Sequence, residues 1–214
     1  MDMLYIATGN EHKVSEISEM LGTEIQCLSM KSLSFPPELI EDGDTFEANA
    51  LAKAEQLASW LTTQDIKHQH WYVLADDSGL EVDALDGRPG VLSARFAAEE
   101  TGAKGNASDE ANNTKLIRLL KNIPEQNRTG RFRCVLALVR PASETTESGQ
   151  WTFSGACEGR LILEPSGDHG FGYDPLFRPE GYDQTFAELG SEIKNEISHR
   201  SRALQQFKSF LSHA

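Results

Sequence analysis

The sequence predicts an α/β protein, because apolar runs typical of buried strands alternate with segments of helical periodicity. Residues 3–7 form a short apolar run, and apolar residues between 14 and 21 then recur at the spacing of a helix face. Longer apolar runs cover residues 71–75 and 132–139, and both contain aromatic and β-branched residues. We expect these two runs to be buried strands of one sheet.

The composition is that of a water-soluble protein of the reducing cytoplasm. At 214 residues the chain can bury one full core or two modest lobes. No stretch approaches the roughly 18 apolar residues that span a bilayer, and no secretory signal is visible at the start. Three cysteines, an odd number without a C-x-x-C pair, indicate reduced thiols. We therefore expect a cytoplasmic protein that does not bind membranes.

The net charge of −13 argues against nucleic-acid binding, which depends on positive surface to displace counterions. It does not argue against a small phosphorylated substrate, since such a substrate needs only a few cations that converge locally. The positions of the basic residues therefore matter more than their number.

An acidic pair, Asp76-Asp77, follows the apolar run 71–75 and precedes Ser78-Gly79. Ligands of open α/β sheets collect at the carboxyl ends of strands, so the pair is expected at such an end. Two adjacent carboxylates are costly to bury unless a cation or a shared proton offsets their repulsion. Mg²⁺ would do this and would also orient phosphates and water. The alternative is an ordinary turn that ends the strand, because Asp, Ser and Gly are common turn residues.

Residues 8–13 (TGNEHK) form a predicted strand-to-helix turn. Such a turn presents free backbone N–H groups and the positive end of the helix to an anion. The alternative is structural: Thr8 or Asn10 caps the helix and Gly9 makes the turn.

A second helix is predicted from Phe46, with Thr45 as its cap and an apolar stripe that continues to Leu61. Lys53 lies off this stripe, and Glu41 sits just before the helix. A solvated lysine is the default interpretation of such a position. His68 and His70 in the following polar connection are expected at the surface, since no H-E-x-x-H motif accompanies them.

Two segments near the C-terminus carry further hints of a ligand. Residues 167–174 (GDHGFGYD) set the rings of Phe171 and Tyr173 among glycines, which suits stacking on a planar base, although Phe171 could instead pack into the core. A last amphipathic helix is predicted over residues 198–211. Its first turn holds His199 and Arg200, and cations are unfavourable there unless an anion compensates them.

Five motifs in this order resemble those of the inosine triphosphate pyrophosphatase family, and together they cover nearly the whole chain. They are Thr8-Gly9-Asn10-x-x-Lys13, Phe46-Glu47-Ala48-Asn49-Ala50-x-x-Lys53, Asp76-Asp77-Ser78-Gly79-Leu80 running on to Pro89-Gly90-Val91-x-Ser93-Ala94-Arg95, Gly170-Phe171-Gly172-Tyr173-Asp174-Pro175-x-Phe177, and Lys194-Asn195-x-Ile197-Ser198-His199-Arg200.

The resemblance implies one α/β domain over residues 1–214, with a long bent mixed sheet flanked by helices and two lobes that enclose a substrate cleft. It also implies a Mg²⁺-dependent homodimer. The implied reaction hydrolyses deaminated purine nucleoside triphosphates (ITP, dITP and XTP) between the α and β phosphates, and it yields the nucleoside monophosphate and pyrophosphate.

The same resemblance implies roles for individual residues. Glu41 and Asp77 would hold Mg²⁺, Asp77 would also be the general base, and Asp76 would support either role. His199 and Arg200 would help to select the base, since hypoxanthine and xanthine carry an oxygen acceptor where adenine carries an amino donor. The implied substrate-binding residues are Thr8, Gly9, Asn10, Glu11, His12, Lys13, Lys53, Ser78, Phe171, Gly172, Tyr173, Asp174, Lys194, His199 and Arg200.

Two alternatives compete with this hypothesis. A Maf-like nucleotide pyrophosphatase would cleave the same bond with a different base preference, and the Phe171 loop and the Ser198-His199-Arg200 segment argue against it. A nucleotide-binding module without catalysis is the other, and the presence of both Glu41 and Asp77 argues against it.

Overall fold

The computed structural model describes residues 3–64, 70–142 and 147–212 of the chain, so the expectation for His68 lies outside the described residues. In this part of the chain, six strands form one sheet in the order β2-β1-β3-β4-β5-β6. β1 pairs in parallel with β2 and with β3, whereas β5 and β6 are antiparallel, so the sheet is mixed. The strands are β1 Met3–Ile6, β2 Cys27–Ser29, β3 Trp71–Val82, β4 Thr129–Arg140, β5 Gly149–Leu161 and β6 Phe177–Pro179.

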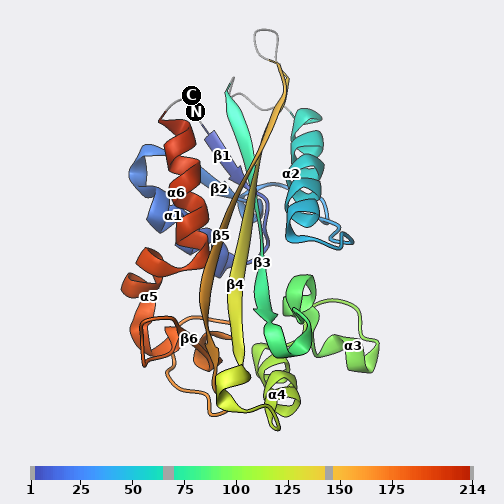
Figure 1. Ribbon diagram of the computed structural model, residues 1–214. Helices are drawn as coiled ribbons and strands as arrows, with labels where there is room; N and C mark the ends of the chain where they lie inside the picture. Colours follow the sequence, from blue (N-terminus) through green and yellow to red (C-terminus); the bar gives the residue numbers. More distant parts are fainter. Residues whose placement is uncertain (1–2, 65–69, 143–146, 213–214) are drawn as a thin grey trace. The chain divides into compact units, whose positions relative to one another are not determined.

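Helices flank the sheet, which confirms the predicted α/β class (Figure 1). The predicted caps Asn10 and Thr45 are confirmed, because their side chains cap α1 and α2, and Ser108 caps α4 in the same way. The helices are α1 Glu11–Leu21, α2 Phe46–Thr62, α3 Ala98–Thr101, α4 Asp109–Leu120, α5 Phe186–Ile197 and α6 His199–Leu211. None of the helices among the described residues is long and apolar enough to cross a membrane.

The chain divides into two compact units, which are described separately below. Unit 1 comprises Met1–Asp77, Cys134–Ser154 and Arg202–Ala214, and unit 2 comprises Ser78–Arg133 and Gly155–Ser201. The boundary falls on the peptide bond between Asp77 and Ser78, within β3.

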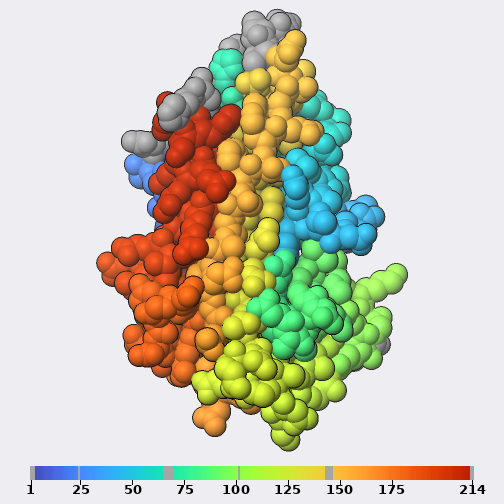
Figure 2. Space-filling view, viewed as in Figure 1, coloured from blue at the N-terminus to red at the C-terminus, as the bar shows by residue number. Residues whose placement is uncertain are grey.

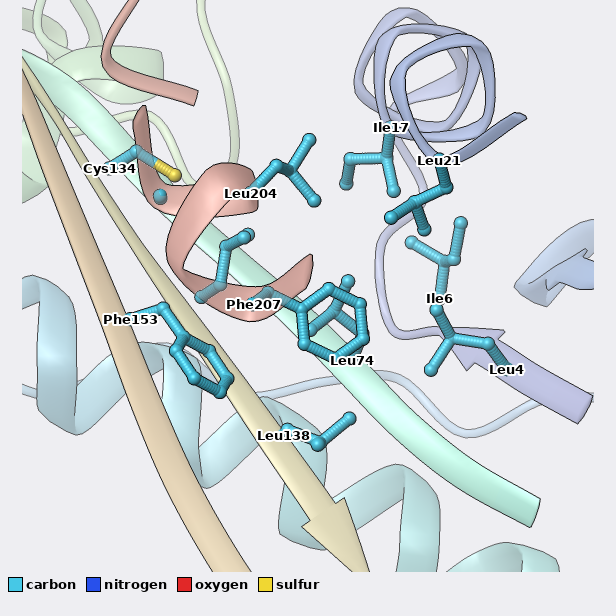
Figure 3. Close-up of a cluster of buried hydrophobic side chains, with 12 residues drawn as sticks. Leu4, Ile6, Ile17, Leu21, Leu74, Cys134, Leu138, Phe153, Leu204 and Phe207 are labelled. Carbon is cyan, nitrogen blue, oxygen red and sulfur yellow. The ribbon is translucent and has the colours of Figure 1, made fainter. Parts of the chain in front are cut away.

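In unit 1, α1 and α6 cover one face of the strands and α2 covers the other (Figure 1). Apolar side chains of the two helices on the first face meet those of the strands in one buried cluster (Figure 3). β5 and α6 lie side by side at the surface (Figure 2), where the Gln206 amide donates to the carbonyl oxygen of Ser154. The cluster consists of Leu4, Ile6, Ile17, Leu21, Leu74, Cys134, Leu136, Leu138, Phe153, Ala203, Leu204 and Phe207.

In unit 2, a second core forms around aromatic side chains of the strands and of α5. The ring centroids of Phe132 and Phe177 are 4.7 Å apart, and those of Phe177 and Phe186 are 5.4 Å apart. Leu116 and Leu120 of α4 pack into the same buried cluster. The sequence did not predict α5, whose pattern is interrupted at Gly190 by a non-helical backbone (φ 76°, ψ 179°).

The expectation that the strand after Trp71 ends at the acidic pair is wrong. β3 continues through Asp76 and Asp77 to Val82, so both carboxylates stand inside a buried strand. Local turn preference gives way here because the residues that follow, Leu80 and Val82, are fully buried and keep the chain extended. The functional and the structural interpretation of the pair both assumed a strand end, and this placement is what the structure corrects.

Candidate active site

The turn before α1 is held together by its own side chains. The Asn10 Oδ1 accepts hydrogen bonds from the backbone N–H groups of His12 (3.0 Å) and Lys13 (3.2 Å). The Thr8 hydroxyl accepts a hydrogen bond from the Asn10 N–H at 3.2 Å. The capping role considered for Asn10 is therefore present, and its amide NH₂ group is the part of this side chain that can donate to a phosphate. Gly9 has an ordinary φ and open space around it, so the turn itself does not require a glycine there.

Asp76 is fully buried and both of its carboxylate oxygens are engaged. The Lys13 ammonium lies 2.5 Å from its Oδ1. On the other side, the Cys134 thiol donates to Oδ2 at 3.3 Å. A buried carboxylate needs such partners, since an unpaired buried charge is very costly. Asp76 therefore fixes Lys13 at the start of α1, and Cys134 fixes Asp76.

Asp77 lies among a different set of partners. The Lys53 ammonium is 2.9 Å from its Oδ1, and the Asn49 amide donates to its Oδ2 at 3.3 Å. Lys53 also donates to the backbone carbonyl of Asp76 at 2.8 Å and forms an ion pair with Glu41 at 2.8 Å. With an exposure of 3%, Lys53 is buried, so the default expectation of a solvated lysine is wrong.

Burial and charge set the proton affinities of this cluster. Burial raises the pKa of Asp77 above that of an ordinary carboxyl, although the ammonium groups of Lys53 and Lys13 act in the opposite direction. For Lys53, burial alone would lower the pKa, but the carboxylates of Asp77 and Glu41 outweigh it and the pKa is raised. The lysine therefore stays charged, while Asp77 gains affinity for a proton. A carboxylate with this property suits proton abstraction from water.

Successive residues of a strand point to opposite faces, which explains why two neighbouring aspartates differ so much. Asp76 points to the face where Cys134 and α1 lie, whereas Asp77 points to the face covered by α2. Asn49 and Lys53 are four residues apart on α2, so they meet Asp77 from one side of that helix.

The carboxylates of Glu41 and Asp77 suit a divalent cation. Both lie within 2.9 Å of the same ammonium nitrogen of Lys53, so two carboxylates already converge on one positive charge. Mg²⁺ is held by one or two protein carboxylates, with phosphates and waters completing its shell. The described residues hold no group of three or more His, Cys, Asp or Glu side chains that could hold a metal ion.

The segment that carries Glu41 is attached to α2 by one side chain. The Gln56 amide accepts a hydrogen bond from the N–H of Ile40 at 2.9 Å and donates one to the Ile40 carbonyl at 3.0 Å. This pair of bonds holds the residue immediately before Glu41. Gln56 was not among the predicted site residues, although its position three residues after Lys53 puts it on the same side of α2.

In unit 2, the predicted base-binding loop is tightly held around Phe171. The Asp174 Oδ2 accepts from the Phe171 N–H at 2.9 Å and lies 2.6 Å from the Lys194 ammonium. That ammonium also lies 4.5 Å from the centroid of the Phe171 ring. Gly170 has a φ of 79°, and a Cβ there would approach Asp174 Oδ2 to 2.2 Å. The ring is only partly buried, so it has not packed into the core.

Three further predicted residues of unit 2, Tyr173, His199 and Arg200, are buried. His199 stacks on Phe132, with ring centroids 4.9 Å apart and an interplanar angle of 14°. Arg200 is 1% exposed and donates to the Ser78 hydroxyl at 3.4 Å. The Tyr173 hydroxyl donates to the Ser93 carbonyl at 2.8 Å, and burial raises its pKa strongly, so this ring is a structural anchor of the loop.

The predicted residues divide between the two units. Unit 1 contains Thr8, Gly9, Asn10, Glu11, His12, Lys13, Glu41, Lys53, Asp76 and Asp77, and unit 2 contains Ser78, Phe171, Gly172, Tyr173, Asp174, Lys194, His199 and Arg200. In unit 1, ion pairs join Lys13 to Asp76 and Lys53 to both Glu41 and Asp77. In unit 2, contacts join Phe171, Asp174 and Lys194 and, separately, Ser78 and Arg200. Glu11 and His12 are exposed in the first turn of α1. A cavity of about 800 Å³ in unit 2 lies near Arg160, Arg178 and Tyr182, and none of the predicted site residues lines it.

Comparison with known proteins shows the family to which this chain belongs. The model of the Ham1 family matches residues 4–210. The dITP/XTP pyrophosphatase of Oceanobacillus iheyensis is 42% identical over 99% of this chain and 98% of its own length, and that of Desulforamulus reducens is 46% identical over 98% and 95%. The structure of a Ham1 protein from Coxiella burnetii covers 100% of both chains with a TM-score of 0.81 and 35% identity. The Ham1 protein of Staphylococcus aureus covers 99% of both with a TM-score of 0.79 and 34% identity. On this agreement in sequence and fold, the chain belongs to the Ham1 family.

Proposed function

We propose that this protein hydrolyses noncanonical purine nucleoside triphosphates (dITP, ITP and XTP) to the nucleoside monophosphate and pyrophosphate. The observation that carries the proposal is the cluster in which Lys53 joins Glu41 to Asp77, beside Lys13 and Asp76. Its cations suit a triphosphate, and its carboxylates suit a metal and a water. Relatives named as dITP/XTP pyrophosphatases, 42–46% identical, support this choice of substrate.

In the proposed reaction, Asp77 takes a proton from the attacking water. The water oxygen forms a bond to phosphorus at the α–β anhydride, the bridging P–O bond breaks, and the electron pair leaves with pyrophosphate. Lys13, Lys53 and the amide of Asn10 bind the phosphate oxygens, each lysine acting as a compact positive charge. Asp76, which is fully buried between Lys13 and Cys134, is proposed to place the Lys13 ammonium while Asp77 takes the proton.

We propose Glu41 and Asp77 as the protein ligands of Mg²⁺. When bound, Mg²⁺ would neutralise charge on the triphosphate and favour attack at phosphorus. A cation at these carboxylates would also lower the pKa of Asp77 from its raised value, which keeps the carboxylate able to accept a proton at neutral pH.

For the base, we propose stacking on Phe171 and donation from Lys194, His199 and Arg200 to purine oxygens. Adenine presents an amino donor where these groups would need an acceptor, and a buried donor that faces another donor is strongly unfavourable. A cytoplasmic location and a homodimer are also proposed on the resemblance, and gel filtration at known concentration checks the second of these.

A substrate panel tests the proposal. Pyrophosphate release should be fastest from dITP, ITP and XTP, slow from dTTP and UTP, and absent for all of them without Mg²⁺. Faster turnover of the pyrimidine nucleotides would instead favour the Maf-like alternative. Equal rates with and without Mg²⁺ would remove the metal from the proposal.

A further inference from the structure

Two side chains of helix α4 form hydrogen bonds with Gly172 of the Phe171 loop. The Asp109 carboxylate accepts a hydrogen bond from the Gly172 N–H at 2.6 Å. The Asn113 amide donates to the Gly172 carbonyl oxygen at 2.9 Å. Asp109 and Asn113 are four residues apart, so both project from one face of α4. The backbone N–H and C=O of Gly172 are therefore both held by the same rigid element.

The Asn113 amide is committed to this contact. Its Oδ1 is buried and has no hydrogen-bond partner among the described residues. Burying an amide with one end unsatisfied is costly, and the bond from its nitrogen to Gly172 is what offsets that cost. An asparagine with no role in holding the loop would be more stable with its amide turned to solvent than buried with one end unsatisfied.

The conformation of Gly172 explains why it needs external support. Its φ is 63°, a left-handed value at which a single residue turns the chain sharply. Because glycine is the most flexible residue, this turn would be loose without other restraints. Asp174 holds the N–H of Phe171, but the peptide that follows the ring is held by Asp109. The direction of the Phe171 ring thus depends on bonds to both of its flanking peptides.

We propose that Asp109 and Asn113 are positioning residues for base recognition: they hold Gly172 so that the Phe171 ring is presented in the orientation in which it stacks on the purine. This inference rests on the proposed function, in which Phe171 binds the base. Neither side chain touches the reacting atoms, so the effect falls on substrate binding and leaves the chemical step unchanged. Loosening the loop lets the ring sample other orientations, which weakens stacking.

Kinetics with ITP test the inference through the separation of KM from kcat. Asp109→Ala and Asn113→Ala should each raise KM about five-fold, the worth of one hydrogen bond, and change kcat less than about two-fold. Asp109→Asn removes the same charge but keeps an oxygen that can accept from Gly172, so it should restore KM close to the wild-type value. The matched control is Glu110→Ala, which removes the same charge from the same first turn of α4 and should leave KM unchanged.

A double-mutant cycle with Phe171→Ala separates this inference from the proposed function. Phe171→Ala alone should raise KM by roughly five-fold or more, because a stacked base contributes about 1–3 kcal/mol. Asp109→Ala should then add no further increase in the Phe171→Ala background. If Phe171→Ala leaves KM unchanged, stacking on Phe171 is wrong and the inference fails with it. If Phe171→Ala raises KM but Asp109→Ala does not, or raises it equally in both backgrounds, the inference alone is overturned.

Discussion

Each oxygen of Asp76 has a partner, one the Lys13 ammonium and the other the Cys134 thiol. Asp77, the next residue, shares Lys53 with Glu41 and keeps a raised pKa. The same side chain therefore serves two purposes at adjacent positions. Asp76 places a cation, and Asp77 is the residue whose environment favours accepting a proton.

Replacing Asp77 by asparagine should nearly abolish turnover. Asparagine has almost the same shape but cannot take a proton from water, and a positioned general base contributes about 10²–10⁴-fold to the rate. ITP should still bind, because the phosphate-binding lysines remain. Single-turnover kinetics and equilibrium binding measure the two effects. The exposed Asp44→Asn serves as the control, and hydrolysis by Asp77→Asn at the wild-type rate would show that another group is the base.

Replacing Cys134 by valine should destabilise the protein through Asp76. The change removes the thiol that donates to Asp76 Oδ2, and the loss of a hydrogen bond to a buried carboxylate costs about 1–3 kcal/mol in the free energy of unfolding. Cys134→Ser keeps a donor and should lose less. Chemical denaturation measures these differences.

The control for this prediction is Cys157→Val, since Cys157 is also buried and its thiol donates to the Glu158 carbonyl oxygen at the long distance of 3.9 Å. An equal loss of stability in Cys134→Val and Cys157→Val would mean that the thiol contact to Asp76 has no special role.

At the scale of elements, α2 carries the polar side chains that organise unit 1. Asn49, Lys53 and Gln56 lie three or four residues apart along one side of the helix, while its apolar side packs on the sheet. Through these residues the helix contacts Asp77, Glu41 and the segment before Glu41. A rigid helix thus sets the distance between the two proposed metal ligands.

Gln56→Leu should therefore weaken the activation of the enzyme by Mg²⁺ more than it lowers the free energy of unfolding. Without the two bonds to Ile40, the segment before Glu41 is free to move, and one proposed Mg²⁺ ligand loses its fixed place. The Mg²⁺ concentration for half-maximal activity should rise about 10-fold, at the lower end of the 10–100-fold range typical of lost supporting contacts. Rates measured across a Mg²⁺ titration test this. Ser59→Leu, at an exposed position of α2, is the control, and an unchanged titration for Gln56→Leu contradicts the prediction.

Local signals in the sequence predicted what depends on local structure. The caps Asn10 and Thr45 were foreseeable because a cap acts within three residues of itself. The burial of Lys53 was not, because it depends on Asp77, 24 residues away in the chain. The continuation of β3 through the acidic pair was missed for the same reason, since pairing and packing partners decide it and turn preference does not.

At the scale of the whole molecule, three carboxyl groups with a lowered pKa all lie in unit 2, namely Asp83, Glu99 and Glu188. A hydrogen bond from the Thr129 hydroxyl lowers the pKa of Asp83, and a hydrogen bond from the backbone N–H of Thr185 lowers the pKa of Glu188. Burial would raise the pKa of Glu99, but ion pairs with Lys115 and Arg88 outweigh it and the pKa is lowered. A carboxylate with a lowered folded-state pKa stabilises the protein above its ordinary pKa. That contribution is lost as the pH falls through the folded-state value.

Unit 2 should therefore lose stability on acidification below about pH 4.5, the ordinary pKa of a glutamate. The three tryptophans, Trp60, Trp71 and Trp151, belong to unit 1, so their fluorescence reports on that unit, while far-ultraviolet circular dichroism reports on both. Glu99→Gln should lower the free energy of unfolding at pH 7 and make it change less as the pH falls. Glu180→Gln, at a carboxylate without an ion pair among the described residues, should change neither. A wild-type pH profile in Glu99→Gln would contradict the prediction.

Because side chains alternate between the two faces along β3, an insertion or deletion within this strand has a large effect. Inserting or deleting one codon between Trp71 and Asp76 would move every later side chain of the strand to the opposite face. Asp76 would then face Lys53 and Asp77 would face Cys134, so the carboxylate that accepts the proton and the one that places a cation would trade surroundings. The different chemical surroundings of Asp76 and Asp77 therefore fix the register of the first half of β3.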